Sequence, residues 1–130
     1  YRFIKLLDFI VDKEDNLICL DQLEKESLIK KFSRNGRLLS KKTLKEKYEI
    51  IASDYWGHLI LLAETKIKVL DSNLRPVMHL FTNPKNLYNA EAITYVDNKK
   101  LYTLHNDPSM VKIFSPRLTL LQKKMNLPKG

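Results

Sequence analysis

The chain has 130 residues, 44% hydrophobic and 29% charged, so it is long and apolar enough to bury a core as one globular domain. No apolar run approaches the roughly 18 residues of a membrane span, and the first residues lack the small-residue cleavage site of a signal peptide. The net charge of +8 is compatible with an anionic partner, but lysine supplies most of it, without the arginine and aromatic interleaving typical of a nucleic-acid groove.

The first 44 residues divide into short segments rich in Ile, Val, Leu and Phe, separated by residues that favour turns. These segments are 6–12, 16–20, 28–33 and 37–44. Such runs predict β-strands. Residues 21–31 and 39–50 have a composition that also suits helices, but the loop equivalent to 21–27 shrinks to 63–66 further along the chain, which favours strands. Cys19, the only cysteine, lies in an apolar run and is expected to be a small core residue; an intrachain disulfide is excluded, and the compartment stays open.

The same pattern returns twice downstream. The segments are 48–54, 58–62, 66–72 and 75–82, and then 91–97, 101–104, 110–116 and 118–125. The leucines that open the second segment of each unit, Leu17, Leu59 and Leu101, are spaced 42 residues apart, and an aspartate precedes each of them (Asp12, Asp54, Asp97). The chain therefore reads as three units, 1–44, 45–87 and 88–130.

The alignment continues into the third segment of each unit. Three positions correspond there: Ile29, Ile67 and Val111; Lys30, Lys68 and Lys112; Phe32, Leu70 and Phe114. We expect the lysine stems to pack between units while their ammonium groups reach water. We expect the recurring aspartates to accept backbone N–H groups and so to form tight turns.

Four strands per unit at this period are typical of β-propeller blades, so the predicted fold is all-β, with about three four-stranded antiparallel blades. The segment 16–39, NLICLDQLEKESLIKKFSRNGRLL, resembles NHL-type and related six-bladed β-propeller repeats. Two leucines depart from that pattern, because Leu74 and Leu118 stand where the first unit has Gly36. The sequence has no WD dipeptide, so the WD40 class is a poorer match.

Three blades do not close a ring, because propellers usually have four to eight. We therefore expect the chain to belong to a longer propeller, or to be completed by another copy or another protein through its open blade faces. A first residue of Tyr1 rather than Met favours the longer parent.

In a blade, the turns after the first and third strands share one face, and here that face collects basic side chains. The turn 54–58 differs from its counterparts in carrying aromatic residues, which are favoured at interfaces. The candidate partner contacts are Tyr55, Trp56, His58, Arg37, Arg75 and Arg117.

The three histidines, His58, His79 and His105, fall at different blade positions: first turn, fourth strand and second loop. With no nucleophile, phosphate-loop or metal-ligand motif present, we expect no catalytic, cofactor or metal site. The leading hypothesis is a non-catalytic propeller scaffold that mediates protein–protein interaction. The alternatives are nucleic-acid binding through the basic face, and a hydrolase or lyase with a metal site in the central channel.

Overall fold

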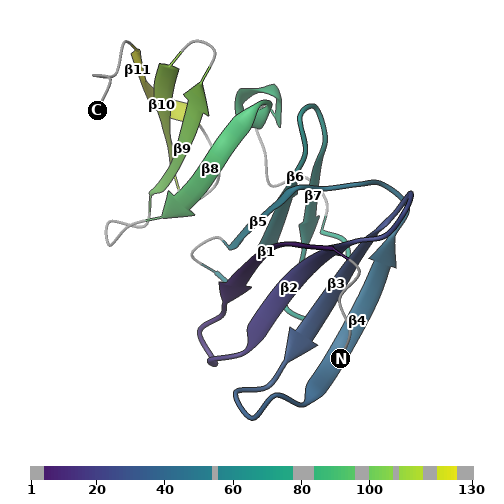
Figure 1. Cartoon of the computed structure of the whole chain (residues 1–130). Coiled ribbons are helices and arrows are strands. Elements are labelled where there is room, and N and C mark those ends of the chain that lie inside the picture. The colour runs from purple at the N-terminus through teal and green to yellow at the C-terminus, as the bar shows by residue number, and fades with distance from the viewer. Residues whose placement is uncertain are drawn as a thin grey trace.

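The computed structural model describes residues 5–53, 56–77, 84–95, 100–106, 109–115 and 120–125. Within these ranges the chain forms three antiparallel sheets and one short 3₁₀ helix (Figure 1). The first sheet contains β1 (Leu6–Val11), β2 (Leu17–Gln22), β3 (Ser27–Phe32) and β4 (Leu38–Leu44), paired in sequence order. The segments 21–31 and 39–50, whose composition also suited helices, contain strands and no helix, as the repeat predicts, with residues 23–26 and 45–49 as connections.

The second sheet contains β5 (Ile50–Ser53), β6 (Leu59–Leu62) and β7 (Ile67–Leu70). The start of the expected fourth segment is visible, because Leu70 forms an isolated bridge with Pro76 and the Val77 N–H donates to the Val69 carbonyl at 2.9 Å. Residues 78–83, the rest of that segment, lie outside the described residues.

The third sheet follows the 3₁₀ helix η1 (Pro84–Leu87). Its strands are β8 (Ala90–Tyr95), β9 (Leu101–Asn106), β10 (Ser109–Phe114) and β11 (Leu120–Met125), again paired in sequence order. The described ranges contain no helix with the length and hydropathy needed to cross a bilayer.

Strand register confirms the alignment of the three repeats. Leu17, Leu59 and Leu101 pair with Phe32, Leu70 and Phe114, respectively. The aligned lysines also take one slot, since Lys30 pairs with Cys19, Lys68 with Leu61 and Lys112 with Thr103. Each sequence repeat is therefore one copy of the same local strand pairing.

The sheets pack face to face through two apolar clusters. One joins Ile18, Leu20 and Ile29 of the first sheet to residues of the second, including Leu59 and Leu61. The other joins Ile60 and Leu62 to Leu101 and Phe114 of the third sheet. Alternate residues of β6 point to opposite faces of the sheet, and each face packs against one of these clusters, so all four side chains are buried.

The first strands of the three sheets, β1, β5 and β8, lie side by side, while the later strands spread away from them (Figure 1). This is the arrangement of propeller blades around an axis. The protein is thus all-β, with three propeller-like blades that do not close into a ring.

Candidate functional site: the turn face

The turn between β1 and β2 is held by a carboxylate, as the sequence predicts. Asp12 Oδ1 accepts the backbone N–H groups of Glu14 and Asn16, each at 2.9 Å. The Asp12 N–H donates to the Asn16 carbonyl at 3.0 Å, and the Asp12 carbonyl accepts the Asp15 N–H at 3.1 Å. The corresponding predictions for Asp54 and Asp97 fall outside the described residues.

The turns after β3 and β7 repeat this geometry. Asp71 Oδ1 accepts the N–H groups of Asn73 and Arg75 at 2.8 and 2.9 Å. Ser33 Oγ accepts the Arg37 N–H at 3.2 Å. The fourth residue of each of these turns, and of the turn before β6, has a positive φ. The values are 62° for Asp15, 84° for Gly36, 87° for Gly57 and 63° for Leu74. One turn type therefore serves both hairpin positions of the blades.

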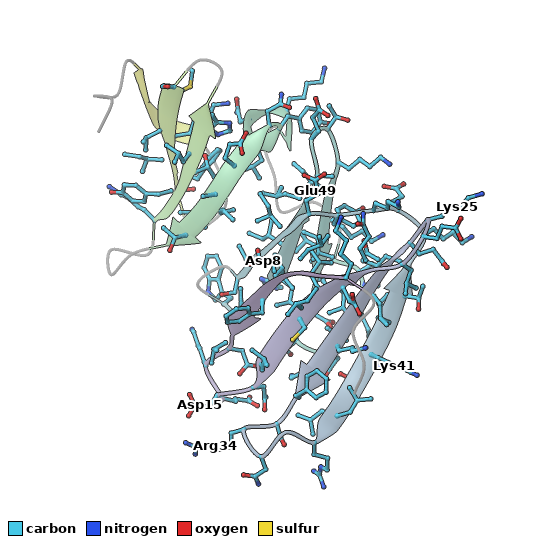
Figure 2. The ribbon with its side chains drawn as sticks, viewed as in Figure 1. Asp8, Asp15, Lys25, Arg34, Lys41 and Glu49 are labelled. Atoms are coloured by element: carbon cyan, nitrogen blue, oxygen red, sulfur yellow. The ribbon has the colours of Figure 1, made fainter. Side chains whose placement is uncertain are left out.

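Two ion pairs link residues at this end of the first sheet, and one hydrogen bond connects it to the turn after β7. Within the first sheet, Arg34 Nη2 lies 3.5 Å from Asp15 Oδ2 across the two hairpin ends (Figure 2). Lys31 Nζ lies 3.7 Å from Asp12 Oδ2 and donates to the Ser72 carbonyl of the second sheet at 3.2 Å. We call the described turn residues 12–16, 33–37, 56–58 and 71–75 the turn face.

The pKa of the Asp71 carboxyl reflects the hydrogen bonds within its turn. The backbone hydrogen bond from Arg75 holds the pKa of its carboxyl below the usual value, and the Asn73 N–H and the positive charges of Arg75 and His58 act in the same direction. Because β6 and β7 are antiparallel and Leu59 pairs with Leu70, the turn before β6 lies next to the turn after β7, as the blade topology predicts.

The structure places four of the six candidate contacts on this face. Trp56 is 53% exposed, Arg37 and Arg75 are exposed, and His58 is half-buried. Arg37 and Arg75 hold the same position, the fifth, in their respective turns. Tyr55 and Arg117 lie outside the described residues.

The turn face is less basic than a count of its lysines and arginines suggests. Carboxylates interleave with the cations, and Asp15 pairs directly with Arg34. The acidic members are Asp12, Glu14, Asp15 and Asp71, against Lys13, Arg34, Arg37 and Arg75. Over these described residues the turn face therefore carries equal numbers of acidic and basic side chains.

A second feature lies along the inner strands. A hollow of about 460 Å³ is lined by residues 7–10, 49–51 and 91–93, that is, by β1, β5 and β8 and the residues at their ends. Asp8, Glu49 and Glu91 contribute carboxyls, but Asp8 accepts the N–H groups of Phe9 at 2.9 Å and Ile51 at 3.0 Å. Asp8 therefore ties the first sheet to the second.

The carboxyls that line this hollow do not form a metal-binding cluster. In the part of the chain that the structure describes, no three His, Cys, Asp or Glu side chains converge in a way that could hold a metal ion. A catalytic metal site needs about three such ligands at one point.

His105 is not in a loop, contrary to the expectation from sequence. It lies in β9, is 6% exposed, and its Nε2 is 2.9 Å from Thr103 Oγ1. Burial lowers the pKa of His105, and the neighbouring charge of Lys112 acts in the same direction, whereas hydrogen bonds to the backbone of Asn89 and Tyr88 and the charge of Glu91 oppose the shift. His105 is thus a buried residue of the third sheet, paired with Ala90 of β8 and Met110 of β10.

The expectation that the aligned lysines reach water is wrong for Lys30. This residue is 6% exposed, and its Nζ lies 3.7 Å from Asp21 Oδ2 inside the first sheet. Lys112 Nζ donates to the Asn86 carbonyl at 2.8 Å, and Lys68 is half-buried. These lysines therefore do not form an exposed basic stripe.

Cys19 is buried, as predicted, and burial raises the pKa of its thiol, so a reactive thiolate is disfavoured.

Sequence reasoning missed the partner of Lys30. Asp21 stands at the slot that Ala63 and His105 take in the other repeats, and an acidic residue on the same face as the aligned lysine, diagonally across the strand pair from it, was the available signal.

Comparison with known proteins supports the fold and carries no assignment of activity. No family model matches the chain, and no curated protein matches it either. Among solved structures, the chain is similar to a protein of unknown function from Bacteroides caccae, with a TM-score of 0.65 at 10% sequence identity. The match covers 92% of this chain and 45% of that one, so the chain spans a little under half the length of the structure it matches.

Proposed function

We propose that the protein is a non-catalytic β-propeller module of the NHL type that binds a protein partner through its turn face. The NHL-type assignment rests on the repeat pattern of 16–39 and its two counterparts. The observation that carries the binding proposal is Trp56, which is 53% exposed on a turn that continues through Gly57, at a φ of 87°, into the fully buried strand β6.

Three properties of this surface favour a protein ligand. Trp, Tyr and Arg are the residue types enriched among interface anchors. Arg37 and Arg75 add exposed guanidinium groups from the same slot of neighbouring sheets. The turn hydrogen bonds around Asp12 and Asp71 fix the backbone before binding, which lowers the entropy lost on association.

The test is affinity capture from a lysate of the source organism, with bound proteins identified by mass spectrometry and then measured one by one with purified partner. Trp56→Ala should weaken a partner by about 2 kcal/mol or more, the loss typical of a buried aromatic anchor. Thr65→Ala, an exposed change in the β6–β7 hairpin at the other end of the sheet, is the matched control and should leave binding unchanged.

The proposal is contradicted if the captured proteins bind Trp56→Ala, and a combined Arg37→Ala and Arg75→Ala variant, as well as they bind the wild type. Binding that persists in a chelator and after nuclease treatment supports a protein partner. Binding that disappears with nuclease and falls steeply with salt would instead establish the nucleic-acid alternative.

A further inference from the structure

The turn between β3 and β4 contains the only Asn–Gly pair in the sequence, Asn35–Gly36. An asparagine can lose its side-chain amide when the backbone nitrogen of the next residue attacks the side-chain carbonyl carbon. A Cβ on that next residue crowds the attack, and glycine has none. This reaction therefore meets less steric hindrance at Asn35 than at any other asparagine of the chain.

The fold presents this pair to solvent. Asn35, Gly36 and Arg37 are exposed, and Arg34 of the same turn stands at an end of the first sheet (Figure 2). A Cβ built on Gly36 would meet nothing within 4 Å, so the space beside this residue is open. Water therefore has access both to the amide of Asn35 and to the peptide that follows it.

Hydrogen bonds within the turn oppose the reaction. The Gly36 N–H donates to the Ser33 carbonyl at 2.8 Å, so the turn must open before this nitrogen can attack. The Ser33 N–H donates to the Arg37 carbonyl at 2.8 Å, and the Arg37 N–H donates to Ser33 Oγ at 3.2 Å. None of residues 33–37 is buried, and such a hairpin end opens locally at a far lower free-energy cost than global unfolding.

The turn after β7 supplies an internal comparison. Asn73 has the position of Asn35, third in its turn, and the Leu74 N–H donates to the Asp71 carbonyl at 2.9 Å, the same bond that Gly36 makes. Leu74 also shares the positive φ, at 63° against 84°. It differs in having a Cβ and in being 3% exposed. The two turns thus present the same amide in the same backbone geometry, and only the first has the features that favour attack.

We propose that Asn35 is a site of spontaneous deamidation, which converts it to a carboxylate on the turn face. The Gly36 nitrogen bonds to Cγ of Asn35, and the side-chain nitrogen leaves as ammonia with the proton of the Gly36 N–H. Water then adds to either carbonyl of the cyclic succinimide and opens the ring. The product is an aspartate, or an isoaspartate in which the backbone runs through the side-chain carbon, and water is the only co-reactant.

The product places a negative charge among cations. Residue 35 lies between Arg34 and Arg37, and Arg34 Nη2 is 3.5 Å from Asp15 Oδ2. The new carboxylate is a second acceptor for the Arg34 guanidinium, and it turns the equal balance of acidic and basic side chains on the turn face into an acidic excess. Isoaspartate also lengthens the backbone of the turn by one carbon. This inference is independent of the proposed turn-face partner.

The test is peptide mapping by mass spectrometry after prolonged incubation of the folded chain in mildly alkaline buffer, which favours deprotonation of the attacking nitrogen. Asn35 should be converted to aspartate and isoaspartate more than about tenfold faster than Asn73, because only the second turn places a Cβ and a buried side chain after the asparagine. Asn35→Gln, whose longer side chain must close a larger ring, should leave the turn 33–37 unmodified.

Variants at the following residue separate the steric cause from the opening of the turn. Gly36→Ala should slow conversion of Asn35, although the strain of alanine at this φ favours opening. Leu74→Gly should make Asn73 reactive, whereas Leu74→Ala, which loses nearly the same core side chain but keeps a Cβ, should not. Circular dichroism establishes that each variant is folded during the incubation. If the Leu74 variants unfold, the Gly36→Ala comparison, made at an exposed residue, decides the question.

Incubation of the wild type in urea gives the rate without the turn. If Asn35 is converted in urea but stays unchanged in the folded chain, the hydrogen bonds of the turn protect it, and the proposal is overturned. Equal rates at Asn35 and Asn73 in the folded chain would also overturn it, as would undiminished conversion in folded Gly36→Ala.

Discussion

Lys30 and Asp21 form an ion pair inside the first sheet, with Lys30 Nζ 3.7 Å from Asp21 Oδ2 and side chains that are 7% and 0% exposed. The second carboxylate oxygen of Asp21 accepts the Lys5 N–H at 2.7 Å. Asp21 therefore compensates a buried charge and also holds the entry of β1 against β2.

Replacing Asp21 by Asn should destabilise the protein by about 3–5 kcal/mol, because Lys30 then keeps a buried charge without its counter-charge. Urea denaturation measures the free energy of unfolding. Adding Lys30→Met to Asp21→Asn should recover much of the loss, since an apolar side chain of similar length needs no partner. A single-variant loss below about 1 kcal/mol would show that water reaches this pair.

Leu74 combines a strained backbone with a core side chain, because its φ is 63° and it is 3% exposed. Leu74→Ala should cost about 2–5 kcal/mol through the cavity that it leaves. Leu74→Gly should be more stable than Leu74→Ala by about 1 kcal/mol, because glycine adopts positive φ without strain. Thermal unfolding of the two variants gives the comparison, and an alanine variant at least as stable as the glycine variant would contradict it.

Gly36 isolates the backbone part of that effect. It has a φ of 84°, and a Cβ at this position would meet nothing within 4 Å. Gly36→Ala should therefore cost about 1–2 kcal/mol from backbone strain alone. A change without effect would show that this turn adopts a different conformation when the glycine is replaced.

His105 predicts a pH dependence of stability. Its pKa in the folded protein lies below 6.5, so the unfolded chain takes up the proton first as the pH falls. The neutral ring contributes its full stability above pH 6.5, and this contribution declines as the pH drops below that value. The total loss is about 1.4 kcal/mol for each pH unit by which the folded pKa lies below the unfolded one. Urea midpoints between pH 7.5 and pH 5 measure this decline.

His105→Gln is the matched control, since a neutral amide keeps a hydrogen-bonding group without titrating. The variant should show a flatter stability profile between pH 6.5 and pH 5 than the wild type. Equal profiles would mean that another group carries the dependence. The charge of Lys112 opposes protonation of the ring, and the charge of Glu91 favours it.

Asp71 predicts a second pH effect, because the fold favours the charged form of this carboxyl, whereas it favours the neutral form of His105. Because its folded pKa lies below 3.8, its contribution to stability is present above that pH and is lost as the pH falls through the folded value. NMR titration of the carboxyl should give a pKa below 3.8. In Asp71→Ala the turn loses the acceptor for Asn73 and Arg75, and the hydrogen exchange of those amides should accelerate; Asp71→Asn, which keeps an oxygen acceptor, should retain part of the protection.

The strand pairing could be predicted from the sequence because it is local. The 42-residue spacing of Leu17, Leu59 and Leu101 implies equivalent hairpins, and the period of two along a strand then decides which side chains share a face. The repeat therefore predicts that Leu17 and Leu59, and likewise Phe32 and Leu70, are equivalent, and the structure shows which of them pair.

The site residues could be predicted less well, because their surroundings come from other segments. The residues around His105 include asparagine, aspartate and proline, which favour a loop, yet β9 extends to Asn106 through its pairing with β10. Lys30 looked solvated because its partner lies in a stretch of loop-like composition. The contact of Lys31 with Ser72 depends on how the first and second sheets pack together, and the spacing of residues along the sequence does not reveal that packing.

The burial of β6 on both faces has a consequence for cooperativity. Among the described strands it lies between two apolar clusters, so opening it would disrupt both, whereas β4, at the far edge of the first sheet, contributes only Leu44 to the first cluster. In a row of repeats, stability is the sum of each unit and its neighbours. The amides of Ile60 and Leu61 should therefore exchange with solvent deuterium most slowly, with protection decreasing outward into the first and third sheets.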